Sequence, residues 1–172
     1  MLMNKPIGIF DSGIGGTSIW KEVIKLLPNE NTIYLADSKN APYGEKSPEE
    51  ILSLSIKNTE LLISKGCKLI IVACNTATTN AINYLRATYN IPFIGIEPAI
   101  KPAALLSKTG AVGILATKGT LASDLFEKTA KEYTKNITTI EQDGEGLVPL
   151  IEAGKLNSTE INNLLSTYLE PM

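Results

Sequence analysis

Short apolar runs alternate with segments of helical periodicity along this sequence of 172 residues. The apolar runs do not alternate apolar with polar residues, which is typical of parallel strands buried on both faces. We expect strands at residues 7–10, 32–36, 69–73, 93–96 and 112–116, with a weaker strand at 138–141. Strands and helices in this order predict an α/β fold, in which a parallel sheet is flanked by helices.

Amphipathic segments between and after these strands predict the helices. The pattern indicates helices over residues 17–27, 75–89, 119–133 and 145–154, a helix opening at Ser47 and running towards Lys65, and another opening at Asn157. Ser47-Pro48-Glu49-Glu50 has the composition of a capping box with proline at the first helical position. Residues 157–160 can form a second capping box.

A change of domain is indicated at Glu97-Pro98. Residues 1–97 contain four of the expected strands and form a first α/β domain. Residues 98–172 supply two strands at most, which is too little for a doubly wound sheet with covered faces. We therefore expect the second α/β domain to be incomplete, as if the chain stopped within it.

Composition and charge narrow the classes of partner. The formal net charge is −2 and no run of lysine or arginine occurs, so we expect no nucleic acid partner. The N-terminus has no apolar signal segment, and no apolar run approaches the ~20 residues that span a bilayer. The sequence thus predicts a cytoplasmic protein with a small-molecule substrate and no membrane partner. It leaves the oligomeric state open, with a homodimer as one option.

The sequence contains no histidine. This excludes a Ser-His-Asp triad, a Cys-His dyad and histidine-based metal sites within these residues. The two cysteines, Cys67 and Cys74, do not have zinc-ligand spacing, and we expect no metal site. Catalysis by this chain would have to rest on carboxylates, thiols, hydroxyls and backbone dipoles.

Polar side chains follow the expected strands at their carboxyl ends, where open parallel sheets bind ligands. These are Asp11-Ser12-Gly13, Asp37, Cys74-Asn75-Thr76, Glu97 and Thr117-Lys118-Gly119-Thr120. Cys74 stands at the start of a helix, where the partial positive charge favours a thiolate. Asn75 and Thr76 add donors for a small carboxylate. A nearby ionised Asp11 would oppose the thiolate, and we expect the helix and the donors to prevail in part.

Each of these features also permits a plainer interpretation. Free cysteines are commonly buried as small hydrophobes, and Pro42-Tyr43-Gly44 can be a simple turn. Asp11 could cap the helix over 17–27, although it lies too far upstream to do so simply. The segment FDSGIGG partly fits a dinucleotide fingerprint, with Asp37 as the ribose-binding acid, but Ser18 replaces the third glycine. A non-catalytic module for a small acid or a nucleotide is therefore an alternative.

Four motifs in order resemble glutamate racemases of the aspartate/glutamate racemase superfamily. They are FDSGIGG at 10–16, APYGEKS at 41–47, ACNTAT at 73–78 and GILATKGT at 113–120. The resemblance implies a flavodoxin-like racemase domain facing a second domain across a cleft. It also implies interconversion of L- and D-glutamate without a cofactor, supplying D-glutamate for peptidoglycan. Aspartate racemase or a related superfamily enzyme is the nearest alternative.

The same resemblance implies roles for individual residues. Cys74 matches the first of two catalytic cysteines, and Asp11 matches the carboxylate that assists it. The substrate-binding positions are Asp11, Ser12, Tyr43, Gly44, Asn75 and Thr76, with Thr117 and Thr120 as further cleft residues. The family's second catalytic cysteine lies in a motif resembling Gly-Cys-Thr-His, which this sequence does not contain. We therefore expect the chain to be the N-terminal portion of a racemase and to be inactive alone.

Overall fold

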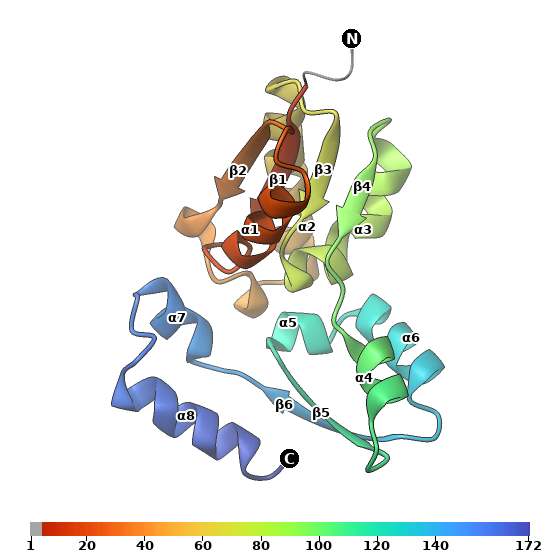
Figure 1. The fold of residues 1–172 in the computed structure, drawn as a ribbon, viewed down its shortest axis with the longest axis vertical. Coiled ribbons are helices and arrows are strands. Elements are labelled where there is room, and N and C mark those ends of the chain that lie inside the picture. Colours follow the sequence, from red (N-terminus) through yellow and green to blue (C-terminus); the bar gives the residue numbers. More distant parts are fainter. Residues whose placement is uncertain (1–4) are drawn as a thin grey trace. The chain divides into compact units, whose positions relative to one another are not determined.

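The computed structural model describes residues 5–172 and divides the chain into two compact units (Figure 1). The first unit ends at Glu97 and the second begins at Pro98. The division falls where the sequence indicates a change of domain. None of the helices within residues 5–172 is long and apolar enough to cross a membrane.

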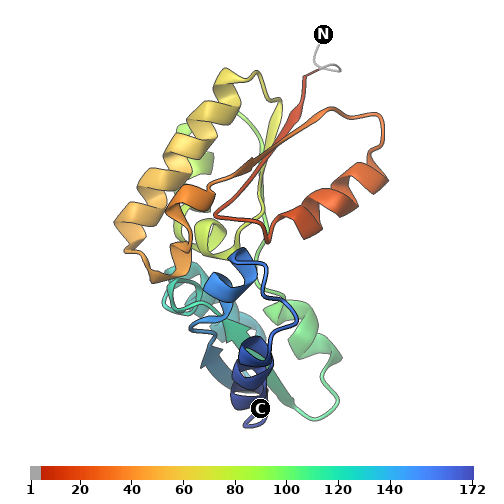
Figure 2. The same ribbon diagram turned by 90° about the vertical axis from the view of Figure 1, so that its left-hand side faces the viewer.

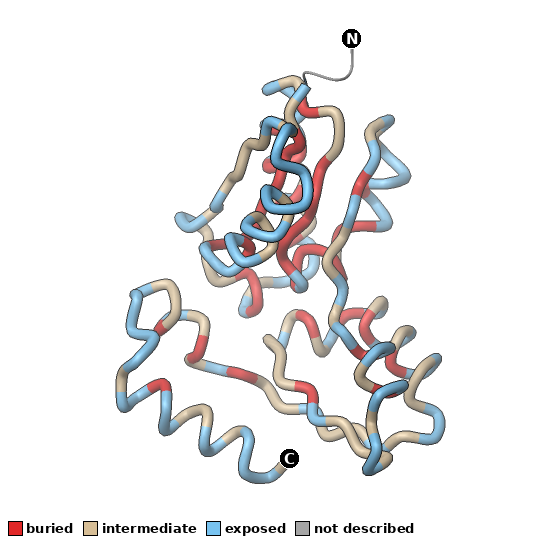
Figure 3. The backbone as a smooth tube through the Cα atoms, viewed as in Figure 1, coloured by how far each residue is buried: buried red, intermediate tan, exposed pale blue. Residues whose placement is uncertain are grey.

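The first unit is built on a four-stranded parallel sheet in the order β2-β1-β3-β4. Its strands are β1 (Ile7–Asp11), β2 (Thr32–Ala36), β3 (Leu69–Val72) and β4 (Phe93–Gly95). This order is that of flavodoxin-like sheets, and the predicted α/β class is confirmed. Figure 3 shows β1 and the end of β3 buried. The expectation that all strands are buried on both faces is wrong for β2 and β4, the two edges of the sheet: β2 is mostly half-buried, and Ile94 of β4 is exposed.

Helices cover both faces of this sheet, as Figure 2 shows. The helices are α1 (Thr17–Leu26), α2 (Pro48–Ser64) and α3 (Asn75–Thr88), and two 3-10 turns, η1 (Ser38–Asn40) and η2 (Tyr43–Glu45), precede α2. Ile19, Trp20 and Val23 of α1 pack on the face formed by Ile7 and Ile9. Because side chains alternate along a strand, Gly8 lies on the other face, close to Leu62 of α2. The capping box of Ser47 and Glu50 that begins α2 is confirmed.

The second unit contains a two-stranded parallel sheet of β5 (Ala111–Ala116) and β6 (Thr138–Asp143). Its helices are α4 (Ile100–Leu106), α5 (Lys118–Leu121), α6 (Asp124–Tyr133), α7 (Leu147–Glu152) and α8 (Thr159–Leu169). Ile114 of β5 joins a cluster with Ile100 and Phe126, from α4 and α6. The next residue, Leu115, points to the opposite face and packs against the cluster formed by α7 and α8.

Two helix predictions in the second unit differ from the structure. The helix expected over 119–133 is divided into α5 and α6, because the buried hydroxyl of Ser123 accepts a hydrogen bond from the Phe126 N–H and begins a new helix. The last helix begins one residue later than expected. Ser158 is its N-cap and accepts from the Ile161 N–H at 3.2 Å, so the capping box from Asn157 is not formed.

Candidate active site

The carboxyl ends of β1, β2 and β3 meet at one edge of the first sheet. Asp11 is paired with Ala36 of β2, and Phe10 is paired with Val72 of β3. The hydrogen-bond ladder continues past the strands, because the Asp37 N–H donates to the Asp11 carbonyl at 2.9 Å and the Ala73 N–H donates to the Phe10 carbonyl at 2.8 Å. The residues that follow the three strands are therefore held side by side.

Cys74 lies two residues after the end of β3 and is the N-cap of α3. Its Sγ accepts a hydrogen bond from the Ala77 N–H at 3.4 Å, so the thiol satisfies one of the N–H groups that a helix start leaves unpaired. The thiol also donates to the Ser12 hydroxyl at 3.5 Å. Only 7% of the Cys74 surface is exposed. The apolar strand thus stops at a cysteine because the thiol caps the next helix and contacts the loop after β1.

Asp11 is buried and its carboxylate is held by the loop that follows it. The Oδ2 atom accepts from the Gly16 N–H at 2.8 Å, and Gly16 is the N-cap residue of α1. As expected from its distance upstream, Asp11 does not cap this helix, whose N-cap is Gly16 without a side-chain cap. The turn nevertheless brings its carboxylate back to the Gly16 N–H. A Cβ on Gly16 would lie 2.8 Å from the Asp11 Cβ and 2.9 Å from the Ala73 Cβ. Glycine is therefore required for this close approach.

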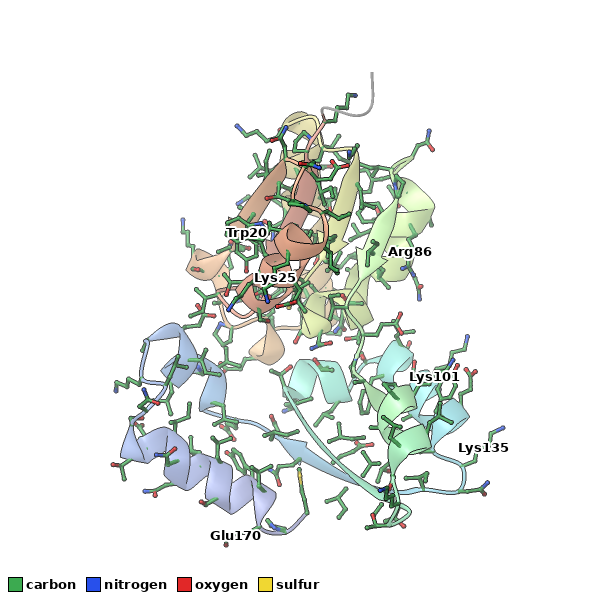
Figure 4. The ribbon with its side chains drawn as sticks, in the orientation of Figure 1. Trp20, Lys25, Arg86, Lys101, Lys135 and Glu170 are labelled. Carbon is green, nitrogen blue, oxygen red and sulfur yellow. The ribbon has the colours of Figure 1, made fainter. Side chains whose placement is uncertain are left out.

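Two aromatic residues support the same loop. The Tyr34 hydroxyl donates to the Gly13 carbonyl at 3.2 Å. The Tyr34 ring stacks on Trp20 of α1, which Figure 4 labels, with 5.2 Å between ring centroids. The Trp20 indole N–H in turn donates to the Thr32 hydroxyl at 2.9 Å. These contacts join β2, α1 and the loop after β1, the loop that includes Ser12.

The electrostatic environment of Cys74 favours the neutral thiol. Burial, followed by the charge of Asp11, raises the pKa of Cys74 to about 11, while hydrogen bonds from the Ala77 N–H and from Ser12 lower it. The prediction that the helix start and the donors prevail is therefore wrong for this arrangement. Desolvation outweighs them because the sulfur is enclosed and the nearest carboxylate has the same sign as a thiolate. The higher reactivity expected for Cys74 over Cys67 stays a prediction, because burial also raises the pKa of Cys67.

Tyr43 lies at this edge, but its hydroxyl is already bonded within the protein. It donates to Asp37 Oδ2 at 2.6 Å and accepts from Asn58 Nδ2 at 3.0 Å. Burial, followed by the hydrogen bond to Asp37, raises the pKa of Tyr43. Asn40 donates to the other Asp37 oxygen at 2.8 Å. With both oxygens engaged, Asp37 is poorly placed to bind a ribose, which disfavours the nucleotide interpretation.

The structure brings together several of the residues that the motifs single out. Asp11, Ser12 and Cys74 lie close to one another. Asn75, which is exposed, and Thr76, which is buried, follow in the first turn of α3. Tyr43 and Gly44 are buried in η2, which packs against α3. In the second unit the hydroxyls of Thr117 and Thr120 lie 3.1 Å apart. Substrate binding by any of these residues stays a prediction.

Sequence reasoning missed two contributors, Tyr34 and Asn58. Tyr34 belongs to an apolar run and Asn58 to the middle of a helix, so neither stands next to a motif. A polar residue on the buried side of a helical pattern, as Asn58 is, was the one available signal. Within residues 5–172 no three His, Cys, Asp or Glu side chains form a group suited to a metal ion.

Fold and site together define an α/β protein with a buried thiol and carboxylate at the carboxyl edge of a flavodoxin-like sheet. Residues 7–168 match the family described as Asp/Glu/Hydantoin racemase. The chain belongs to this family, which confirms the resemblance carried by the four motifs.

Curated relatives and solved structures agree with this assignment. A glutamate racemase of Clostridium perfringens strain SM101 is 50% identical over 171 residues, which cover 99% of this chain and 66% of the relative. One of Herpetosiphon aurantiacus is 46% identical, with 99% and 67% covered. The structure of glutamate racemase isoform RacE1 from Bacillus anthracis has a TM-score of 0.87 at 30% identity, with 98% of this chain and 64% of that chain covered. The chain thus spans about two thirds of the length of the curated relatives it matches.

Proposed function

We propose that this protein takes part in the interconversion of L- and D-glutamate and that Cys74 is one of two proton-transfer groups in that reaction. The observation that carries the proposal is the contact of the Cys74 thiol with Ser12 beside the buried carboxylate of Asp11. Similar structures support glutamate as the substrate. The Escherichia coli racemase, 34% identical with a TM-score of 0.85, was solved with L-glutamate, and 97% of this chain and 64% of that chain are covered.

The reaction requires a weakly acidic proton to leave one face of Cα and a proton to arrive on the other. In the proposed step the Cys74 thiolate takes the Cα proton, and the electron pair of the C–H bond passes into the α-carboxylate. A second acid then donates a proton from the opposite face. Asn75, Thr76 and backbone N–H groups at the start of α3 are suited to hold the α-carboxylate as its charge increases. No cofactor takes part in this proposal.

Formation of the thiolate is the step that the substrate would assist. The pKa of Cys74 is raised to about 11 by burial and by Asp11, so the resting thiol is neutral at pH 7. The ammonium group of a bound amino acid would bring a positive charge between Asp11 and Cys74 and favour ionisation of the thiol. Under this proposal Asp11 serves to attract that ammonium group and orient it.

Cys67 is not suited to be the second proton-transfer group. It precedes β3 whereas Cys74 follows it, so the two cysteines lie roughly 20 Å apart along the strand direction. Its thiol is buried against Gly8, where a Cβ would come within 2.9 Å of the Cys67 Sγ. Residues 98–172 contain no cysteine. We therefore propose that residues 1–172 alone supply one of the two proton-transfer groups and do not racemise glutamate.

A chimera tests this proposal. Residues 1–172 are joined to the part of the Clostridium perfringens relative that the alignment leaves uncovered. We expect the folded chimera to interconvert D- and L-glutamate, followed by chiral chromatography, without added pyridoxal phosphate, metal or nicotinamide. Cys74→Ser should abolish the reaction, and Cys67→Ser should retain it. A folded chimera that is inactive, or that acts on aspartate in preference to glutamate, would refute the proposal. In the cell we propose a cytoplasmic role in supplying D-glutamate for peptidoglycan.

A further inference from the structure

Asn58 is a buried polar residue in the middle of α2. Only 5% of its surface is exposed, and the other buried residues of this helix include Ile51 and Leu62. A carboxamide in such surroundings costs free energy unless it is hydrogen-bonded. Its Nδ2 atom donates to the Tyr43 hydroxyl at 3.0 Å and lies 3.5 Å from Asp37 Oδ2.

The Tyr43 hydroxyl joins three separate segments of the first unit. It accepts from Asn58 of α2 and donates to Asp37, which directly follows β2, at 2.6 Å. We call Asp37, Tyr43 and Asn58 the Tyr43 clamp. Asn40 also donates to Asp37, at 2.8 Å, so these hydrogen bonds tie the loop together from Asp37 to Tyr43. The Tyr43 hydroxyl thus both donates and accepts within the clamp, as a buried hydroxyl in a polar network requires.

The clamp lies next to the candidate thiol. Tyr43 belongs to η2, and η2 packs against α3, the helix that Cys74 caps. A negative charge on Cys74 contributes to the raised pKa of Tyr43, an effect that needs the two groups to be close. The η2 segment of this loop therefore lies beside the helix that Cys74 begins.

We propose that Asn58 is a positioning residue of the Cys74 site, and that it acts through the Tyr43 hydroxyl to hold residues 38–46 beside the thiol. Ser55, one turn earlier on α2, is a buried polar residue that bonds within its own helix and so serves for comparison. Its hydroxyl donates to the Ile51 carbonyl at 2.7 Å. The proposal rests on the proposed function only in taking Cys74 as the reactive group. It does not depend on which amino acid the site accepts.

The test is the rate at which iodoacetamide alkylates Cys74 in the 172-residue chain at pH 9. Peptide mapping separates Cys74 from Cys67, which serves as the internal control. We expect Asn58→Leu to raise the Cys74 rate roughly fivefold, the factor given by loss of one net hydrogen bond that keeps a segment closed. Tyr43→Phe should raise it similarly. The double variant should be no faster than Tyr43→Phe, because both changes break the same contact. Ser55→Ala should leave the rate unchanged.

The proposal is overturned if Asn58→Leu stays within twofold of the unmodified chain, if the two single effects multiply in the double variant, or if Ser55→Ala has the same effect. Circular dichroism establishes that each variant is folded. Asn58→Ala, which introduces no extra bulk, is judged by the same criteria should Asn58→Leu fail to fold. An inactive chimera would count against the racemase proposal and leave these rates unaffected, so the two failures are distinguishable.

Discussion

The thiol of Cys74 and the hydroxyl of Ser12, 62 positions apart in the sequence, lie 3.5 Å from each other across the ends of two neighbouring parallel strands. This contact joins the loop after β1 to the start of α3. It also places a neutral hydroxyl beside the sulfur. The hydrogen bond with this hydroxyl lowers the pKa of Cys74, whereas the charge of Asp11 raises it. The ionisation of Cys74 is therefore a balance that single substitutions can shift in either direction.

Ser12→Ala should make Cys74 less reactive. The hydrogen bond with Ser12 lowers the pKa of Cys74, because the hydroxyl can turn and donate to the thiolate. Its loss should slow alkylation at pH 8 by about two- to fivefold, as expected for one hydrogen bond to a charged group. The measurement is iodoacetamide labelling with peptide mapping, and the Cys67 rate should not change. Faster labelling of Cys74 in this variant would contradict the account.

Asp11→Asn should have the opposite effect on the same rate. The charge of Asp11 raises the pKa of Cys74, and an amide in its place can still accept from the Gly16 N–H. We expect labelling of Cys74 at pH 8 to become about three- to tenfold faster, as for removal of a neighbouring like charge. In the chimera, racemisation should nevertheless fall, since the proposed ammonium-binding group is lost. A variant with slower labelling, or with undiminished racemisation, would count against the assigned role of Asp11.

The raised pKa of Cys74 also predicts how stability depends on pH. The thiol titrates near pH 9 in the unfolded chain and near pH 11 in the folded one. The unfolded chain therefore loses its proton first, and the stability associated with the neutral thiol is complete below pH 9 and is lost between pH 9 and 11. Cys74→Ser does not titrate there. It should lose less stability than the unmodified chain over this interval, by on the order of 1 to 2 kcal/mol in urea unfolding. Parallel pH profiles for the two proteins would refute the assignment.

Gly16→Ala should destabilise the first unit. An added Cβ would lie 2.8 to 2.9 Å from Asp11, Ala73 and Tyr34, so the loop after β1 would have to move. We expect a loss of about 2 kcal/mol in the free energy of unfolding. Gly15→Ala is the matched control, because a Cβ there would meet only Asp11 Oδ2, at 3.6 Å. Equal stability of the two variants would show that the close approach at Gly16 has no energetic weight.

Much of the first unit follows from local patterns. Apolar runs without alternation place all four strands within a residue or two, and the side chains of Ser47 and Glu50 mark the start of α2. The failures have long-range causes. The state of the Cys74 thiol depends on Asp11, 63 positions away, and on burial that no helix-start rule includes. The Tyr43 hydroxyl looks available within its motif because Asn58 lies in another element.

The second unit shows a failure of a different kind. The periodicity over residues 119–133 fits one helix, and only the cap formed by Ser123 divides it. Ser123 is followed three residues later by Phe126 rather than by a glutamate, so no capping-box signature marks the break. The predicted start of α8 was misplaced for another reason. Asn157 and Ser158 are both good N-cap residues, and the structure uses Ser158.

Exchange of the Cα hydrogen of glutamate with solvent deuterium tests the central claim most directly. The chimera is incubated in D2O with each enantiomer of glutamate, and loss of the Cα proton signal is followed by NMR. If Cys74 takes the proton from one face, the unmodified chimera exchanges both enantiomers. Cys74→Ser should then lower exchange of at least one enantiomer by three orders of magnitude or more, about the effect of losing a positioned general base. Exchange of both enantiomers at undiminished rates in Cys74→Ser would contradict the account.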